Sequence, residues 1–340
     1  MTFSGKIRNL KLTAPRHEAV LLFVVVIEWL YFNFVGARFG SLDNTFDIIR
    51  HSTEIGLLSL AMTPVILTGG IDLSVGSVLC FCAIAFGKMW RDAHLPIWVA
   101  AFGTLGVGAL AGGLNAFLIT RLRLPPLIVT LGSYSLFRGL AEAITRGVDS
   151  FTNFPADFLA LGQDHLLGVP AQAWIFGAVA IALWLLVHGT TIGRAIRAIG
   201  FSPEGARYAG IRVERRLALV YVLSGVIAAV AAIIYTARIG QAKADAGIGY
   251  ELIAITAVVL GGTSIFGGVG SVHGTLLGTA AIAVLNNGLV HARQPREVAG
   301  MLTGLLLILA LTISSLPKVL SFRRVLRNNS GPSMPANENS

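Results

Sequence analysis

The chain has 340 residues, of which 54% are hydrophobic and only 13% are charged, and its formal net charge is +9. Soluble domains carry about 25% charged residues, so this composition excludes an ordinary soluble protein and is typical of a membrane protein made of apolar helices. The positive charge does not indicate nucleic-acid binding, because the lysines and arginines lie between the apolar runs, where they determine membrane topology.

The N-terminal region predicts a first membrane span. Residues 1–18 are basic, and an apolar run follows from Ala19 to Val35. No small-residue cleavage site precedes Arg38, so we interpret the run as an uncleaved span and residues 1–18 as a cytoplasmic segment.

Seven further apolar runs follow along the chain, at 55–87, 97–120, 126–145, 172–188, 217–237, 252–290 and 299–317. A helix of roughly 20 residues crosses the ~30 Å hydrocarbon layer, so the first and sixth of these runs are too long for one crossing. Each contains a glycine-rich interruption, at 69–72 and at 261–271. Length alone does not decide whether the run 55–87 crosses the membrane once or twice, because it is too long for one crossing and short for two.

The distribution of positive charge favours dividing both long runs. The loop 189–216 holds six arginines, whereas the segment 147–172 has no lysine or arginine. Leaving the first long run intact would place the arginine-rich loop outside, against the positive-inside rule. We therefore expect an all-α polytopic membrane protein with about ten transmembrane helices, some short or broken, and with both termini cytoplasmic. Its transmembrane domain would cover residues 19–320, followed by a polar, disordered tail over 321–340.

The loop 189–216 contains the signals of a single short helix. Ser202 is a good N-cap, Pro203 suits the first position and Glu204 the first turn, and Gly210 is placed to end the helix. From composition alone, two interpretations stay open. The segment is either a solvated loop whose arginines only fix the membrane topology, or a short capped helix that lies across the cytoplasmic face.

Several polar residues lie within the apolar runs. Asp72 is the single charge in its run, so it either caps the following helix or lies in a solute pathway, and the two roles are compatible. Ser74, Asn115, Asn286 and Asn287 are further candidates for the pathway, although asparagine in a membrane also bonds neighbouring helices.

A charged pair lies on one predicted helix. Arg138 and Glu142 are four residues apart, so they either pair on one helix face, or Arg138 reaches toward the outer surface.

The sequence lacks the motifs of an enzyme. Neither Gly–Lys pair is followed by Ser or Thr, since Ile7 and Met89 occupy those positions, so a phosphate-binding loop of the G-x-x-x-x-G-K-[ST] type is absent. The histidines and cysteines do not have the spacing of metal ligands. We expect neither a bound metal nor a cofactor.

Five blocks, in the same order, resemble the permeases of ribose-type sugar importers, the second class of carbohydrate ABC importers. They are TGGIDLSVGS (68–77), PPLIVTLG (125–132) with FRGL (137–140), PEGARYAGI (203–211), AVVLGGTS (257–264) and LNNGL (285–289). The sequence departs from the family pattern at Gly205, where alanine is usual, and this weakens the short helix by up to ~1 kcal/mol.

The resemblance implies the function. It implies the transmembrane permease subunit of a bacterial ABC importer for a monosaccharide, located in the inner membrane, whose alternating access is driven by a separate ATP-binding subunit. The other implied partners are a periplasmic sugar-binding protein, a second permease copy or paralogue, and membrane lipid. The implied coupling helix comprises Pro203, Glu204, Gly205, Ala206, Arg207 and Gly210.

The alternative is a secondary, ion-coupled transporter of a small polar solute. Such a protein uses intramembrane carboxylates, for which Asp72 and Glu142 are the candidates. The sequence does not distinguish among ribose, rhamnose, related hexoses and sugar-like signalling furanoses.

Overall fold

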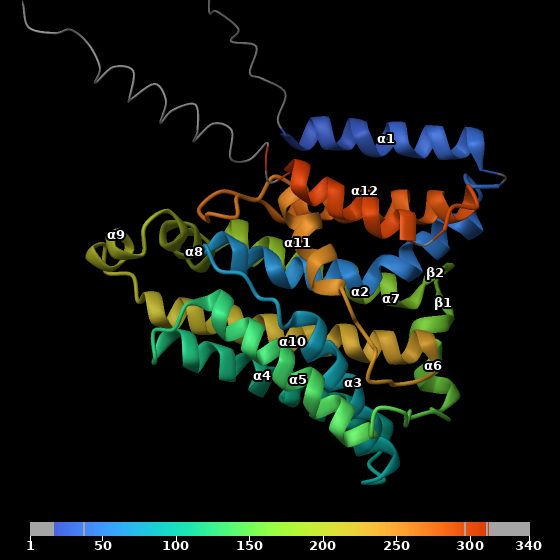
Figure 1. Ribbon diagram of the computed structural model, residues 1–340, viewed down its shortest axis with the longest axis horizontal. Coiled ribbons are helices and arrows are strands. Elements are labelled where there is room, and N and C mark those ends of the chain that lie inside the picture. The colour runs from blue at the N-terminus through green and yellow to red at the C-terminus, as the bar shows by residue number, and fades with distance from the viewer. Residues whose placement is uncertain (1–16, 37, 296, 311, 313–340) are drawn as a thin grey trace, which may run out of the picture.

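The computed structural model describes residues 17–36, 38–295, 297–310 and 312. Within them the chain is a bundle of helices that lie side by side (Figure 1). The predicted polar tail, and almost all of the predicted N-terminal segment 1–18, fall outside the described residues.

The helices follow one another along the chain with short connections. The first half contains α1 (His17–Val35), α2 (Leu42–Leu67), α3 (Val75–Arg91), α4 (Ile97–Thr120) and α5 (Pro126–Thr145). The second half contains α6 (Ala156–Gln163), the two-residue strands β1 (His165–Leu166) and β2 (Val169–Pro170), α7 (Ala171–Trp184), a π-helical turn (Leu185–Gly189), α8 (Thr191–Phe201), α9 (Pro203–Tyr208), α10 (Val213–Ile239), α11 (Tyr250–Leu260), α12 (Val272–His291) and a further apolar helix, Glu297–Ala310.

Both long apolar runs are broken where the sequence predicted. The first divides between α2 and α3, and the second divides between α11 and α12. Gly69 and Gly262 lie in these breaks with φ of 80° and 86°, a left-handed conformation that glycine adopts without strain. With 11 residues, α11 is about 16 Å long and covers only half of the hydrocarbon thickness, as expected for a broken helix.

α2 begins much earlier than its apolar run. The run starts at Ile55, but α2 begins at Leu42, where the side chain of Ser41 accepts a hydrogen bond from the backbone N–H of Asn44 at 3.2 Å. The first half of this helix is polar, so an apolar-run count misses it. These extra residues explain why the run 55–87 was too short for two crossings.

The class of fold is confirmed. Among the described residues, five helical segments are long and apolar enough to cross a membrane: α1, α4, α5, α10 and α7 with its π-helical turn. Each predicted span contains a helix, but the number of crossings and the side on which the termini lie stay predictions.

The two helix breaks and the loop 189–216 come together at one end of the bundle. The N–H of Gly268 donates to the carbonyl of Leu67 at 2.9 Å, which joins the two helix breaks to each other. α8 and α9 lie at this end, whereas α6, β1 and β2 lie at the other (Figure 1). There Phe151 and Ala242 exchange backbone hydrogen bonds of 3.0 and 2.9 Å. We call these two ends the inner and the outer end.

α10 forms the centre of the bundle and packs on α2, α3 and α4. Gly108 and Gly112 of α4 lie against the backbone of α10 near Gly225, leaving no space for a β-carbon. Such small residues allow helix backbones to approach closely in a membrane, where packing rather than the hydrophobic effect drives association. α1, by contrast, packs mainly on α12.

Both expectations for Arg138 were wrong. Its side chain is buried, and Nη1 donates to the carbonyls of Ala244 and Ala246 at 2.6 and 2.9 Å. No ion pair within the described part of the chain joins it to Glu142, which is exposed. The reason is the non-helical segment between α10 and α11, whose carbonyls need donors inside the protein.

Candidate functional site

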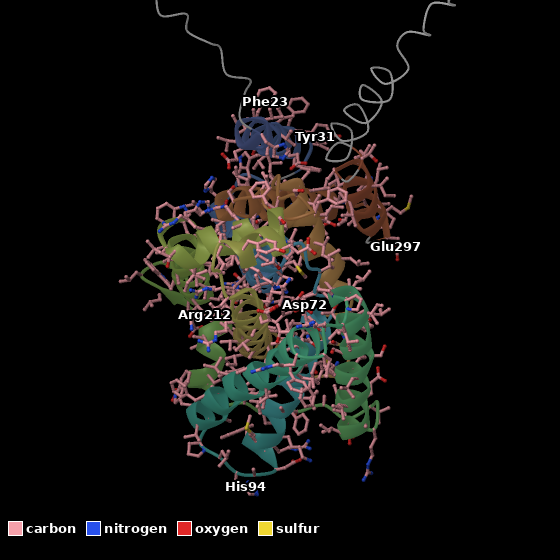
Figure 2. All side chains as sticks on the ribbon, turned by 90° about the vertical axis from the view of Figure 1, so that its left-hand side faces the viewer. Phe23, Tyr31, Asp72, His94, Arg212 and Glu297 are labelled. Atoms are coloured by element: carbon pink, nitrogen blue, oxygen red, sulfur yellow. The ribbon has the colours of Figure 1, made fainter. Side chains whose placement is uncertain are left out.

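The middle of the bundle contains a buried polar cluster centred on Asp72. Oδ1 of Asp72 accepts hydrogen bonds from the backbone N–H of Ser74, at 3.0 Å, and from its hydroxyl. Oδ2 accepts from the hydroxyl of Ser224 at 3.0 Å. Nδ2 of Asn115 donates to Oγ of Ser74 at 2.9 Å, and the Ser133 hydroxyl donates to Oδ1 of Asn115. We call these five residues the central cluster; Figure 2 shows Asp72 at the centre.

The central cluster connects four parts of the fold. Asp72 and Ser74 precede α3, Asn115 lies on α4, Ser133 on α5 and Ser224 on α10. Asp72 was expected to be the N-cap of the following helix, but α3 begins at Val75 with Ser74 as its N-cap. Asp72 lies two residues before this observed cap, although its carboxylate accepts the Ser74 N–H. Three of the predicted pathway residues thus meet, but they bond to one another; their role in a pathway stays a prediction.

Asn286 and Asn287, the other predicted pathway residues, lie near the outer end. They line a cavity of about 490 Å³ between α2 and α12, which we call the outer cavity. Asn44 of α2 donates through Nδ2 to Oδ1 of Asn287 at 3.0 Å, and its Oδ1 lies 2.8 Å from Nε2 of His291. Sequence analysis missed Asn44 because it belongs to the polar first half of α2.

A buried ion pair next to the outer cavity was also missed. Nε of Arg238 donates to Oε1 of Glu54 at 2.7 Å, and the Glu54 side chain is fully buried. Nη1 of Arg238 lies 3.2 Å from Nδ1 of His51. The available signal was that Glu54 directly precedes an apolar run, since a carboxylate carried into a bundle requires a cation from another helix.

The predicted short helix is present at the inner end as α9. Oγ of Ser202 accepts from the backbone N–H of Gly205 at 3.0 Å, Pro203 is the first helical residue, and Gly210 follows the C-cap with φ of 78°. The expectation of a single helix was incomplete, because Ser202 also ends α8, an 11-residue helix capped by Thr190. Two helices joined at Ser202 therefore form this surface.

Five of the six predicted coupling residues are exposed, and the sixth is buried. Pro203, Glu204, Gly205, Arg207 and Gly210 face outward. Ala206 is 4% exposed and packs with Ile199 and Val213, so it faces the interior of its own chain. Two aromatic side chains are also highly exposed here, with Tyr208 94% and Phe201 70% exposed. We call the outward face of α8 and α9 the α8–α9 surface.

Two arginine side chains also bond α8 and α9 to the rest of the bundle. Arg207 pairs with Glu214 of α10 at 2.9 Å. Arg197 of α8 donates through Nη1 to the carbonyl of Val187 at 2.9 Å and through Nη2 to that of Gly270 at 3.5 Å. Burial lowers the pKa of Arg197, but the guanidinium stays charged because its ordinary value is far above neutral pH.

α8 also touches both helix breaks. Gly200 lies against the carbonyl of Leu67 and the N–H of Gly268, and a β-carbon there would overlap both. Beside this contact, a cavity of about 390 Å³ is lined by Pro203 and Gly69, among other residues. α8 is therefore in direct contact with the breaks, whereas α9 has free space beside it.

Comparison with known proteins identifies the class of protein. Residues 44–311 match the family described as branched-chain amino acid transport system / permease component. The chain is 38% identical over 302 residues to the autoinducer 2 import system permease protein LsrD of Photorhabdus luminescens, covering 86% of this chain and 89% of that protein. It is 37% identical over 296 residues to LsrD of Escherichia coli strain K12, with the same coverage. No solved structure matches the chain.

The chain belongs to this family of transport-system permease components. The resemblance to sugar-importer permeases is therefore confirmed, and so is the expected multi-pass location in the inner membrane. Within the described residues, no group of three or more His, Cys, Asp or Glu side chains is placed to hold a metal ion.

Proposed function

We propose that this permease imports a small sugar-like solute, and that autoinducer 2, the solute named in its relatives, is the first solute to test. The observation that carries the proposal is the 37–38% identity to autoinducer 2 import permeases over 86% of the chain. The polar, uncharged side chains of the outer cavity suit such a solute.

The proposed transporter has further subunits. A separate ATP-binding subunit would dock on the α8–α9 surface and carry the nucleotide site. A periplasmic sugar-binding protein would deliver the solute at the outer end, and a second permease, identical or paralogous, would complete the pathway. The exposed Tyr208 and Phe201 support a docking role, since aromatic side chains are enriched at protein interfaces.

The proposed coupling follows from the contacts of α8. A shift of the α8–α9 surface would act through Gly200 on the end of α2 and on the segment between α11 and α12, because no space separates these backbones. Packed backbones transmit such a displacement as a rigid-body movement. The two helix breaks would then be the points at which ATP-driven motion changes access to the pathway.

The transport proposal is tested by uptake. Bacteria that lack their own autoinducer 2 importer would express the complete transporter, with or without this chain, and removal of autoinducer 2 from the medium would be measured. We expect removal only with the chain present. Removal that does not depend on the chain, or competition by leucine but not by autoinducer 2, would show that autoinducer 2 is not the solute of this permease.

The docking proposal is tested by placing a charge on the α8–α9 surface. Tyr208→Asp is expected to reduce co-purification of the ATP-binding subunit at least about tenfold, the effect of losing an interface residue worth more than ~1.4 kcal/mol. The matched control is Leu167→Asp, because Leu167 is 84% exposed at the outer end. The control should retain the subunit, and both variants should elute from size exclusion as the wild type does. Full retention by Tyr208→Asp would exclude the α8–α9 surface as the docking site.

A further inference from the structure

The outer cavity has the size of a small-molecule site. Its volume of about 490 Å³ lies within the range of roughly 300–1,000 Å³ that is usual for ligand pockets. It lies between two helices that are distant in the sequence, α2 and α12, and is open rather than fully enclosed.

The charge of the cavity lining indicates the class of ligand. Among the described residues, no lysine or arginine lines the cavity, and Asp47 is the one acidic side chain in the lining. The side chain of Asp47 is 50% exposed and is neutralised by Arg50, whose Nη1 lies 3.3 Å from Oδ1 of Asp47. The remaining polar lining consists of amides, hydroxyls and imidazoles, so the cavity suits a neutral, hydroxyl-bearing solute and not a phosphorylated one.

A threonine in this lining has an unused hydroxyl. Buried helical threonines in the described part of the chain generally donate to the carbonyl three or four residues earlier, as Thr256 and Thr104 do at 2.7 and 2.8 Å. Thr279, which is 6% exposed and lines the cavity, has no hydrogen-bond partner, and Thr236 is the other buried helical exception among the described residues. Burying a hydroxyl without a partner is costly, so the Thr279 hydroxyl is available to water or a ligand.

Two neighbouring side chains add an acceptor and a donor. Oδ1 of Asn286 is buried and has no partner within the described residues. Nδ1 of His51 lies 3.2 Å from Nη1 of Arg238, and because a guanidinium only donates, His51 must be the tautomer that carries its proton on Nε2. Donor and acceptor groups thus line one space, which is the arrangement that sugar hydroxyls require, since each hydroxyl both donates and accepts.

We propose that the outer cavity is a solute-binding site of the permease itself, in which Thr279, Asn286 and His51 bond the hydroxyls of a neutral sugar-like molecule. The inference rests on the proposed function for the solute class, but the site is argued from the unpartnered polar atoms and the charge of the lining. Solute released at the outer end would occupy the cavity before it moves inward. This adds a selection step within the membrane subunit.

The first test measures protection of an introduced cysteine. Ser52 lines the cavity, while both native cysteines are buried, so Ser52→Cys provides a specific target for a water-soluble thiol reagent. In vesicles containing the complete transporter, D-ribose or autoinducer 2 is expected to slow labelling about threefold at a concentration of twice the dissociation constant. D-ribose 5-phosphate should not slow it. Leu167→Cys, outside the cavity, should be labelled equally under all conditions.

The outcomes separate the site from the solute assignment. Protection by D-ribose together with a failed autoinducer 2 uptake assay would support the site and change the solute. Autoinducer 2 uptake without any protection of Ser52→Cys over a full titration of both sugars would overturn the site while leaving the proposed function intact. Equal protection by D-ribose 5-phosphate would also contradict the proposed site, which is argued to bind neutral solutes.

The second test uses a matched pair of substitutions. Thr279→Val and Thr236→Val each replace a buried, unpartnered hydroxyl with a methyl group, but only Thr279 lines the cavity. Loss of one hydrogen bond to solute weakens its binding, so uptake by Thr279→Val at a subsaturating solute concentration is expected to fall about fivefold. Thr236→Val should transport at the wild-type rate, and both should assemble with the ATP-binding subunit. Equal uptake by the two variants would refute the proposal.

Discussion

The central cluster and the outer cavity are both built from polar side chains. They differ in whether the buried polar atoms of those side chains have hydrogen-bond partners within the protein. In the central cluster, both Asp72 oxygens, the Ser74 hydroxyl and both polar atoms of Asn115 have partners within the chain. In the outer cavity, the Thr279 hydroxyl and the Asn286 carbonyl have none among the described residues. A buried polar group in a membrane protein needs a hydrogen-bond partner. The groups of the central cluster find theirs on other helices and so hold these helices together, whereas Thr279 and Asn286 of the outer cavity can bond water or solute.

The comparison shows that residue type does not assign a role in this protein. Asn115 and Asn286 are both asparagines in apolar helices, yet only Asn115 is saturated by serines from other parts of the chain. The following substitutions would separate the two regions, in order of decreasing expected effect on stability.

The largest loss of stability is expected for Asp72→Ala. It leaves the Ser74 and Ser224 groups buried without their acceptor, at about 1–3 kcal/mol for each unsatisfied group. Thermal denaturation of the purified permease in detergent should show a large drop in melting temperature, and Asp72→Asn should show a smaller one. A melting temperature unchanged in Asp72→Ala would mean that the carboxylate does not hold α3 and α10 together.

A smaller loss is expected for Asn115→Leu. The substitution keeps the approximate volume but removes the amide that connects Ser74 to Ser133, at roughly 1–3 kcal/mol. The same melting assay applies, and Ser133→Ala in the Asn115→Leu background should cost little more, because the two substitutions remove one shared interaction. Additive losses would indicate that the two residues act independently.

The smallest change in stability is expected for Asn286→Ala. Its carbonyl has no partner to lose within the described residues, so the free energy of unfolding should change by less than about 0.5 kcal/mol. Uptake should nevertheless fall. Reduced uptake with unchanged stability distinguishes a residue that contacts the solute from one that bonds another helix. A melting temperature lowered as far as in Asn115→Leu would place Asn286 in the same structural class as the central cluster.

The sequence by itself determined the features that depend on neighbouring residues. Glycine at 69 and 262 predicted the helix breaks, because the left-handed backbone there is a local property. Ser202 and Pro203 predicted the start of α9 for the same reason. Apolar runs predicted the helical class, and five separate motifs predicted the family.

Only the tertiary structure decided which polar residues meet. Asn44 and Asn287 are 243 residues apart and hydrogen-bonded, and Glu54 and Arg238 form an ion pair that no local pattern indicates. The burial of Ala206 likewise depends on α8 and α10, not on its own short helix. Helical periodicity defines the faces of one helix, but which face meets which neighbouring helix depends on packing between distant segments. That packing decides whether an asparagine side chain bonds another helix or is free to bond the solute.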